Sequence, residues 1–240
     1  MNWALAAGMP PPLFLAVLVG TGALLAAIGP PIERVLRTIY DRDESFQLLL
    51  TFALVLVFED VIRFIWGTAP HQLGNVYLVY GQLRIGGTTV PVYNLVVIGA
   101  GGLIAVGMGW LLARTRFGRI VRAAAENREM SAALGVDMSR VYTRVFTLGV
   151  ALGTIGGALV IPATAAINEM GIELIVEAFA VVVIGGLGSM RGAFVGALIV
   201  GVLKGVAIAT WPELEMLAIY VIVIAVLVIR PAGLFAKTTA

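Results

Sequence analysis

The chain has 240 residues, of which 60% are apolar and only 12% are charged, and its mean hydropathy is +1.01. Soluble domains are about 45–50% apolar and about 25% charged, so this composition indicates an integral membrane protein. The net charge of +2 gives no reason to expect a nucleic-acid partner. With no cysteine and one histidine, His71, we expect no disulfide, no metal site and no cofactor.

Seven apolar segments are candidates for membrane-spanning helices, which need about 20 residues to cross the hydrocarbon core. They cover residues 12–28, 46–66, 92–112, 141–161, 174–187, 193–209 and 216–229. The last three are short, so some are expected to be tilted, broken or re-entrant. The sequence therefore predicts an all-α, polytopic transmembrane helical bundle of about seven spans, with a broken segment near 185–192, forming a single domain over residues 1–240.

The distribution of basic residues predicts the orientation, because loops on the cytoplasmic side carry more Lys and Arg. We take 113–140 as a cytoplasmic loop. The segment 29–45 is then also inside, and the basic residues assigned to that side include Arg34, Arg37, Arg42, Arg191, Arg230 and Lys237. The external loops hold Arg84 as their cation and four glutamates, which are Glu169, Glu173, Glu213 and Glu215. The N-terminus is predicted outside and the C-terminus inside, with 67–90 as an external loop of partly hairpin or interfacial character.

A polar segment with seven arginines, ARTRFGRIVRAAAENREMSAALGVDMSRVYTR, separates two apolar runs at residues 113–144. Its alanines favour a short helix with little apolar surface. Gly135 is expected to end that helix, and Asp137 to begin the next one. The pattern is typical of a flat, cationic surface that contacts a cytoplasmic protein and passes force or a signal to it.

The glycine-rich segment GGLGSMRG begins at Gly185, directly after one apolar run and before the next. Irregular backbone in a membrane is tolerated where it is buried in protein or faces a water-filled path. Two interpretations stay open, a broken segment beside the translocation path or the partner, and a tight cytoplasmic turn between packed helices. The candidate residues for the translocation path are Gly185, Gly186, Gly188, Ser189 and Lys204.

Other glycines follow helix faces in the third and fourth predicted spans, and we expect them to serve close helix packing. They are Gly99, Gly101, Gly102, Gly107, Gly109, Gly149, Gly153, Gly156 and Gly157.

Five charged residues fall inside predicted spans, and such residues usually face the bundle interior or water. Glu59 and Arg63 are spaced to pair on one helix face near the external end, next to Asp60. Glu177 is also near the outside. Lys204 lies mid-span, where it either plays a structural part, by snorkelling or neutralising a carboxylate, or contacts the carboxylate of a substrate.

Enzymatic chemistry is not predicted, since no hydrolase, kinase or nucleotide-binding motif is present. The segment GGLGSMRG lacks the Lys-Ser/Thr that ends a phosphate-binding loop.

Four stretches together closely resemble the LivH-type permease of branched-chain amino acid ABC importers. They are FGRIVRAAAENREMSAALGVDMSRVY, VVIGGLGSMRGAFVGALIVG, IERVL and the terminal IRPAGLFA, and the resemblance extends over nearly the whole chain. It implies that residues 118–138 couple the permease to an ATPase. The residues that match the family pattern there are Arg119, Arg122, Ala123, Glu126, Leu134 and Gly135.

The same resemblance implies an inner-membrane subunit that imports branched-chain or other small amino acids. Its expected partners are a second permease subunit (a heterodimer or a homodimer), two cytoplasmic ATPase subunits, a periplasmic substrate-binding protein and the lipid bilayer. Alternatives are an importer for urea, amides or other small polar solutes, an ATP-independent channel or secondary carrier, and a scaffold subunit without a pathway. The arginine-rich segment argues against the carrier, which has no ATPase to contact.

Members of the resembled family begin with further spans that include an Asn-Phe-Ala-His-Gly stretch, which this chain lacks. The sequence starts about where the third span would be, so we expect either a start at an internal methionine or a shortened member.

Overall fold

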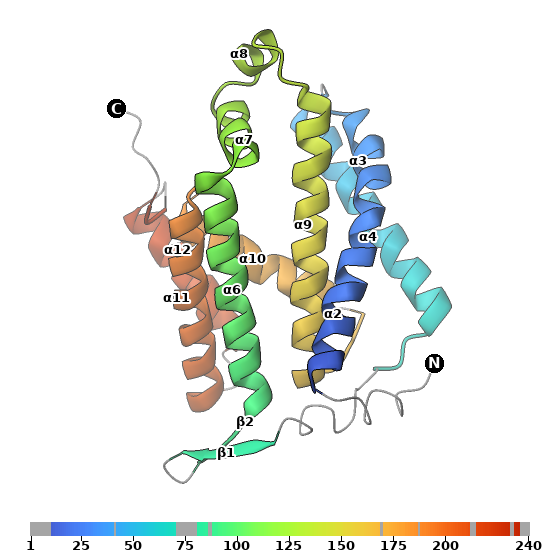
Figure 1. Cartoon of the computed structure of the whole chain (residues 1–240). Helices are drawn as coiled ribbons and strands as arrows, with labels where there is room; N and C mark the ends of the chain where they lie inside the picture. Colours follow the sequence, from blue (N-terminus) through green and yellow to red (C-terminus); the bar gives the residue numbers. More distant parts are fainter. Residues whose placement is uncertain are drawn as a thin grey trace. The chain divides into compact units, whose positions relative to one another are not determined.

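The computed structural model describes residues 11–40, 42–70, 81–85, 88–168, 170–186, 188–211, 215–230 and 233–235. The described chain is built from helices and one short β-hairpin, which confirms the predicted all-α class (Figure 1). It separates into two compact units, Met1–Asn168 and Glu169–Ala240, each described on its own below. His71, Glu169, Glu213 and Lys237 lie outside the described residues.

The first unit begins with a helical stretch longer than the sequence suggests. Helix α2 (Pro11–Leu25) passes through a 3-10 turn (Ala26–Ile28) into α3 (Gly29–Arg37). Prolines at the start of α3 have no N–H to donate, and a 3-10 turn accommodates that loss. The helix therefore continues nine residues beyond the end of the predicted first span, 12–28, into the segment 29–45.

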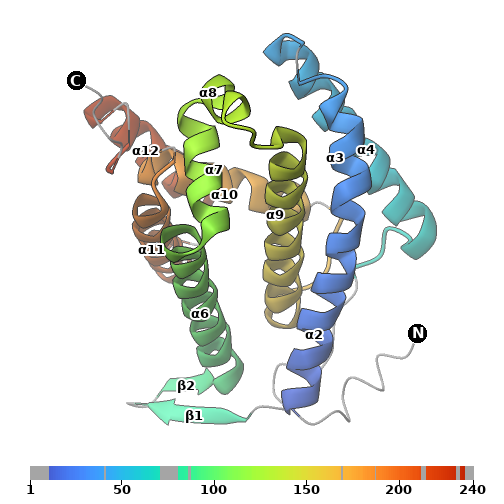
Figure 2. The ribbon, with the colours of Figure 1, turned by 45° about the horizontal axis from the view of Figure 1, so that its top comes forward.

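The remaining elements of this unit follow in chain order. They are α4 (Glu44–Trp66), β1 (Gln82–Ile85), β2 (Thr88–Pro91), α6 (Val92–Arg114), α7 (Arg116–Glu126), α8 (Arg128–Ala133), α9 (Met138–Val160) and a 3-10 turn (Ile161–Ala163). Strands β1 and β2 pair antiparallel, with Gln82 opposite Pro91 and Ile85 opposite Thr88, which confirms the hairpin character expected of 67–90. The hairpin lies at one end of α6, and α7 and α8 lie at the other (Figures 1 and 2).

Helices α2 and α3 run antiparallel to α9 in close contact. The Thr154 hydroxyl donates to the Gly22 carbonyl oxygen at 2.9 Å, and a Cβ on Gly22 would come within 2.6 Å of the Ile155 side chain. Further along the seam, a Cβ on Gly29 would lie 3.0 Å from the Thr147 Cα. Glycine at these two positions therefore lets the helix backbones approach closely.

The glycines predicted to serve helix packing do not do so within the described structure. A Cβ on any glycine of α6, or on Gly149, Gly153, Gly156 or Gly157 of α9, would meet no atom within 4 Å. The expectation of close packing at these positions therefore stays a prediction, because a GxxxG spacing identifies a helix face but not which partner covers it.

A buried tyrosine joins α6 to α9 at the hairpin end of the unit. Tyr93 has no exposed surface, and its hydroxyl donates to the Leu159 carbonyl oxygen at 2.8 Å. A buried phenol needs such a partner, so this bond positions the start of α6 against the end of α9.

The second unit contains α10 (Met170–Gly185), α11 (Met190–Thr210) and α12 (Glu215–Ile229). A Cβ on Gly185 or Gly192 would collide with the backbone of the other, and one on Gly196 would lie 2.6 Å from the Val181 carbonyl oxygen. Helices α10 and α11 therefore pack backbone to backbone on both sides of the turn that joins them.

The residues after α12 return to the end of α10. The N–H groups of Leu234 and Phe235 donate to the carbonyls of Ile184 and Gly185 at 2.9 and 3.2 Å. Gly233 has φ +87°, and a Cβ there would collide with the Gly186 backbone. The two sequence motifs GGLGSMRG and IRPAGLFA thus meet, and the second satisfies carbonyl groups that the helix end leaves unpaired.

Four helical segments of the described chain are long and apolar enough to cross a membrane: Ala16–Arg37, Val92–Arg114, Met138–Ala163 and Met190–Thr210. These correspond to the first, third, fourth and sixth predicted spans. Helix α4 has the length but carries four charged residues, and α10 and α12 have 16 and 15 residues, so these spans stay predictions.

Replacing Gly192 by alanine should destabilise the protein, because the new methyl group meets the Gly185 backbone and the helices must separate. Overpacking of this kind costs about 1–3 kcal/mol. Gly201→Ala on the same helix is the matched control, since open space surrounds its Cβ position. Thermal unfolding of the purified variants in detergent should show a lower melting temperature for Gly192→Ala only, and equal melting temperatures would contradict the packing.

Candidate functional site

The arginine-rich segment begins with a sharp break after α6 at Thr115. The Thr115 hydroxyl accepts from the Gly118 N–H at 3.1 Å, which caps the first turn of α7. Gly118 is buried, and a Cβ there would collide with the Leu112 carbonyl oxygen. The Arg122 guanidinium donates to the same carbonyl oxygen. Helix α7 is therefore fixed closely against the end of α6.

The following junctions are also capped by local side chains. Asn127 ends α7 and accepts from the Met130 N–H at 2.8 Å, which starts α8. Gly135, with φ +84°, ends α8 in a Schellman motif, in which the Val136 N–H bonds to the Ser131 carbonyl oxygen at 3.1 Å. Asp137 then caps α9 by accepting from the Arg140 N–H at 3.1 Å. The predicted helix end at Gly135 and helix start after Asp137 are confirmed.

All six residues assigned to ATPase coupling are exposed on this element. They are Arg119, Arg122, Ala123, Glu126, Leu134 and Gly135. Leu134 is 78% exposed and Met130 on α8 is 59% exposed, so α8 presents apolar side chains beside the cationic surface of α7. We call α7, α8 and the turn to Asp137 the coupling element; its contact with an ATPase stays a prediction.

Aromatic side chains attach the coupling element to the ends of its neighbours. The Arg128 guanidinium lies 5.6 Å from the centre of the Tyr142 ring, and that ring meets Tyr40 edge to face at 5.5 Å. Burial, together with the charge of Glu33, raises the pKa of the Tyr40 hydroxyl, which stays neutral at physiological pH. The three residues come from α8, α9 and the turn after α3, so they join three parts of the unit.

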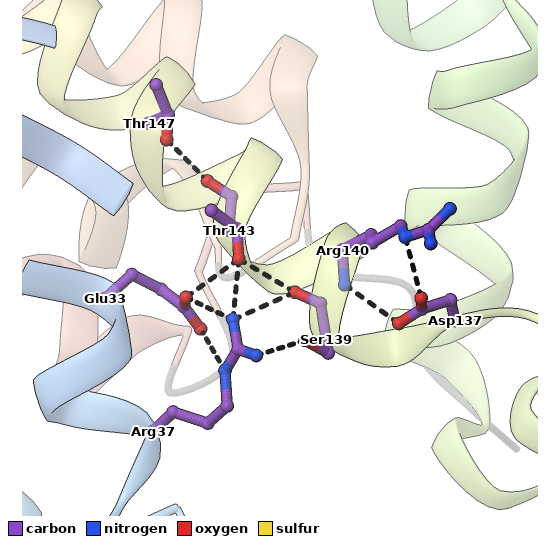
Figure 3. A network of polar contacts seen from close by, with 7 residues as sticks. All are labelled: Glu33, Arg37, Asp137, Ser139, Arg140, Thr143 and Thr147. Carbon is purple, nitrogen blue, oxygen red and sulfur yellow. Dashed lines mark hydrogen bonds and ion pairs between the residues drawn. The ribbon is translucent and has the colours of Figure 1, made fainter. Parts of the chain in front are cut away.

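A polar network next to this cluster ties α3 to the first turns of α9 (Figure 3). Glu33 has no exposed surface, and its carboxylate accepts from two nitrogens of Arg37 and from the Thr143 hydroxyl, the latter at 2.8 Å. Arg37 also donates to the Thr143 hydroxyl at 2.6 Å and to the hydroxyl and carbonyl oxygens of Ser139. A buried charge without such partners would cost several kcal/mol, so α3 and α9 are held in one register here.

The sequence analysis missed this network. Arg37 was interpreted only as a basic residue of the inside segment 29–45, and Glu33 only as part of the IERVL stretch. The signal was present, because Glu33 and Arg37 have the same i,i+4 spacing as Glu59 and Arg63. The predicted Glu59–Arg63 pair is confirmed, at 2.5 Å.

The candidates for the translocation path do not form one site. Gly185, Gly186, Gly188 and Ser189 lie at the turn between α10 and α11, where Gly186 and Gly188 have φ +92° and +80° and the Ser189 hydroxyl caps α11. Lys204 is further along α11 and forms an ion pair with Glu177 of α10. At about 1.5 Å per residue, it lies roughly 22 Å along the helix from Ser189. Among the described residues, no group of three or more acidic or histidine side chains could hold a metal ion.

Comparison with known proteins supplies the family. The model of the branched-chain amino acid transport system permease component matches residues 2–227. The chain belongs to this family. Its members are transport permease components rather than enzymes, and the chain is a multi-pass protein of the inner membrane.

Three curated relatives illustrate the range of similarity. The branched-chain amino acid permease protein BraD of Pseudomonas aeruginosa is 23% identical over 95% of this chain and 76% of its own length. LivH of Escherichia coli K12 is 26% identical over 94% of this chain and 75% of its own length. The fructose import permease protein FrcC of Rhizobium meliloti is 28% identical over 81% of this chain and 55% of its own length. No solved structure matches the chain.

Replacing Arg37 by methionine should destabilise the first unit, because Glu33 is then a buried carboxylate with Thr143 as its remaining partner of the network. The double variant Glu33→Met with Arg37→Met removes the buried charge and should recover part of the lost stability. Arg140→Met is the control, since the Arg140 side chain of the Asp137–Arg140 pair is 76% exposed. Melting temperatures in detergent should fall most for Arg37→Met, less for the double variant and least for Arg140→Met. A double variant less stable than Arg37→Met alone would contradict this account.

Proposed function

We propose that the chain is the membrane subunit of an ABC importer that moves branched-chain amino acids inward, driven by ATP hydrolysed on two cytoplasmic subunits. The observation that carries the proposal is the coupling element, a capped, exposed, arginine-rich helix pair between two spans. An ATP-independent channel or carrier has no partner for such a surface, and a scaffold without a pathway has no need to move.

The construction of the element suits the transfer of force. Thr115 and Asn127 cap the starts of α7 and α8, and Asp137 caps the start of α9 that follows. A push on α7 or α8 therefore moves the ends of α6 and α9 rather than bending a loop. The exposed apolar side chains Met130 and Leu134 offer a contact that a partner protein would bury. On this proposal, the end of the first unit with the coupling element faces the cytoplasm and the hairpin end faces outward.

The remaining partners follow from the importer architecture. A second permease subunit, identical or related, would complete the pathway, and a periplasmic binding protein would deliver the substrate. Transport would proceed by alternating access, in which ATP binding shifts the population between inward- and outward-open arrangements. The similarity to a fructose import permease makes a sugar the second candidate substrate, and uptake assays with leucine, fructose and urea distinguish the candidates.

Ala125→Trp should uncouple transport from ATP hydrolysis. Ala125 is exposed on the coupling element, and an indole there would prevent a partner surface from closing on the small side chains of α7. In proteoliposomes that contain the full complex and the binding protein, leucine uptake should fall at least about tenfold. ATP hydrolysis and membrane insertion should remain.

Ala53→Trp is the matched control, because Ala53 is exposed on α4, outside the coupling element. Normal uptake by the Ala125→Trp complex, recovered in normal yield, would refute docking at this surface.

Cysteine labelling should establish the orientation. The chain has no native cysteine, so single substitutions report without background. Ala133→Cys on α8 should react with a membrane-impermeant maleimide only after the cells are opened. Thr68→Cys should react with the same reagent already in intact spheroplasts. Both residues are exposed, whereas Ser131, on the same helix as Ala133, is only 5% exposed and would label poorly. The reverse pattern would contradict the proposed orientation and the coupling role.

A further inference from the structure

Two opposite charges lie inside the helices of the second unit, near one end. Glu177 is seven residues after Met170 at the start of α10, and Lys204 is six residues before Thr210 at the end of α11. With a rise of about 1.5 Å per residue, each lies roughly 10 Å inside the helix end. In the topology predicted from the sequence, with Glu173 outside and Arg191 inside, this is the external end, where a binding protein would release its substrate.

The ion pair between them is open rather than sealed. The Lys204 Nζ donates to the Glu177 Oε1, and 33% of the Lys204 side chain and 28% of the Glu177 side chain are exposed. The surrounding sequence is apolar, with LIVEAFAVVVI on α10 and LIVGVLKGVAI on α11. Charges at this depth are expensive in lipid and usually face a cavity or the bundle interior, so the open side of the pair requires water, protein or a polar ligand.

The helix beside Lys204 also has free space. Gly201 and Gly205 lie three residues before and one residue after it, and a Cβ on either would meet no atom within 4 Å. Within the described second unit neither glycine is in close helix contact, unlike Gly192 and Gly196 on the same helix. They leave the flank of α11 beside Lys204 without side chains.

We propose that Lys204 and Glu177 bind the zwitterionic head group of an α-amino acid. The substrate carboxylate pairs with Lys204, the substrate ammonium pairs with Glu177, and the absence of side chains at Gly201 and Gly205 leaves room for the head group. Separating an ion pair inside a membrane helix is costly when either charge is left alone. A zwitterion replaces one pair by two, so every charge stays compensated throughout the exchange.

This site rests on the proposed amino-acid import and adds a reason for its selectivity. A neutral sugar or urea carries no charge that could pair with Lys204 or Glu177. It would either leave the ion pair intact or separate the two side chains without giving them new partners of opposite charge. The site would then select against a neutral solute because binding it leaves charged groups unpaired, and not because an amino acid makes additional contacts.

The test uses the complete reconstituted importer with leucine-loaded binding protein at saturation. The double variant Lys204→Met with Glu177→Gln removes both charges, and the exchange variant Lys204→Glu with Glu177→Lys keeps an ion pair in reversed order. A purely structural pair predicts that both variants recover uptake. The head-group site predicts that both lose it at least about tenfold, while complex yield and the stimulation of ATP hydrolysis by the binding protein persist. Glu59→Gln with Arg63→Met, which neutralises the other pair, is the matched control and should keep its uptake.

The outcomes separate the two proposals. Leucine uptake within about twofold of the unaltered complex in either double variant overturns the head-group site alone. If the unaltered complex does not import leucine or another amino acid, the proposed function fails and the site falls with it. If the complex with Lys204→Met and Glu177→Gln does not assemble, uptake by the complex with Lys204→Glu and Glu177→Lys decides between the two accounts, because that variant keeps an ion pair.

Discussion

The buried carboxylate of Glu33 fixes how the first unit is assembled. Apolar helices gain little from leaving lipid for each other, so their arrangement depends on close backbone contacts and polar pairs. Glycines at 22 and 29 bring α2 and α3 against α9, but glycine contacts tolerate sliding. Glu33 and Arg37 restrict that freedom. Their ion pair lies within α3, but a shift of α3 by one turn along α9 would take the Glu33 carboxylate away from the Thr143 hydroxyl and Arg37 away from Ser139, leaving buried hydrogen bonds unmade.

This constraint lies directly beside the coupling element. Arg128 of α8 stacks on Tyr142 of α9, one turn after Ser139, which accepts from Arg37 of α3. A displacement of α8 therefore has a contiguous route of contacts to α9 and α3, the helices joined by the network. At the opposite end the Tyr93–Leu159 bond connects α6 with α9. The unit is thus held at both ends, which suits motion of whole helices rather than local bending.

Local features were predictable from the sequence, and partners were not. The helix end at Gly135 and the start at Asp137 follow from backbone geometry within a few residues, and both were predicted correctly. The contact of Glu33 with Thr143 spans 110 residues, and the Glu33–Arg37 spacing indicated only one side of it. The same limit applies to Gly149 and Gly153, which have the helix-packing spacing but no neighbour within 4 Å among the described residues, while Gly22 contacts Ile155 without that spacing. A single sequence shows which residues share a helix face, but only the fold shows which faces contact each other.

The second unit applies two different solutions to polar groups at its two ends. At the turn of α10, the free carbonyls of Ile184 and Gly185 are satisfied by backbone N–H groups of Leu234 and Phe235, so two distant motifs form one closed structure. Such an end cannot accept a ligand without losing those bonds. Near the other end, Lys204 and Glu177 are satisfied by side chains, whose partners can be exchanged while the helices stay in place. Lys204 and Glu177 can exchange partners without breaking a backbone hydrogen bond of α10 or α11. Substrate contact therefore fits that pair better than the glycine turn.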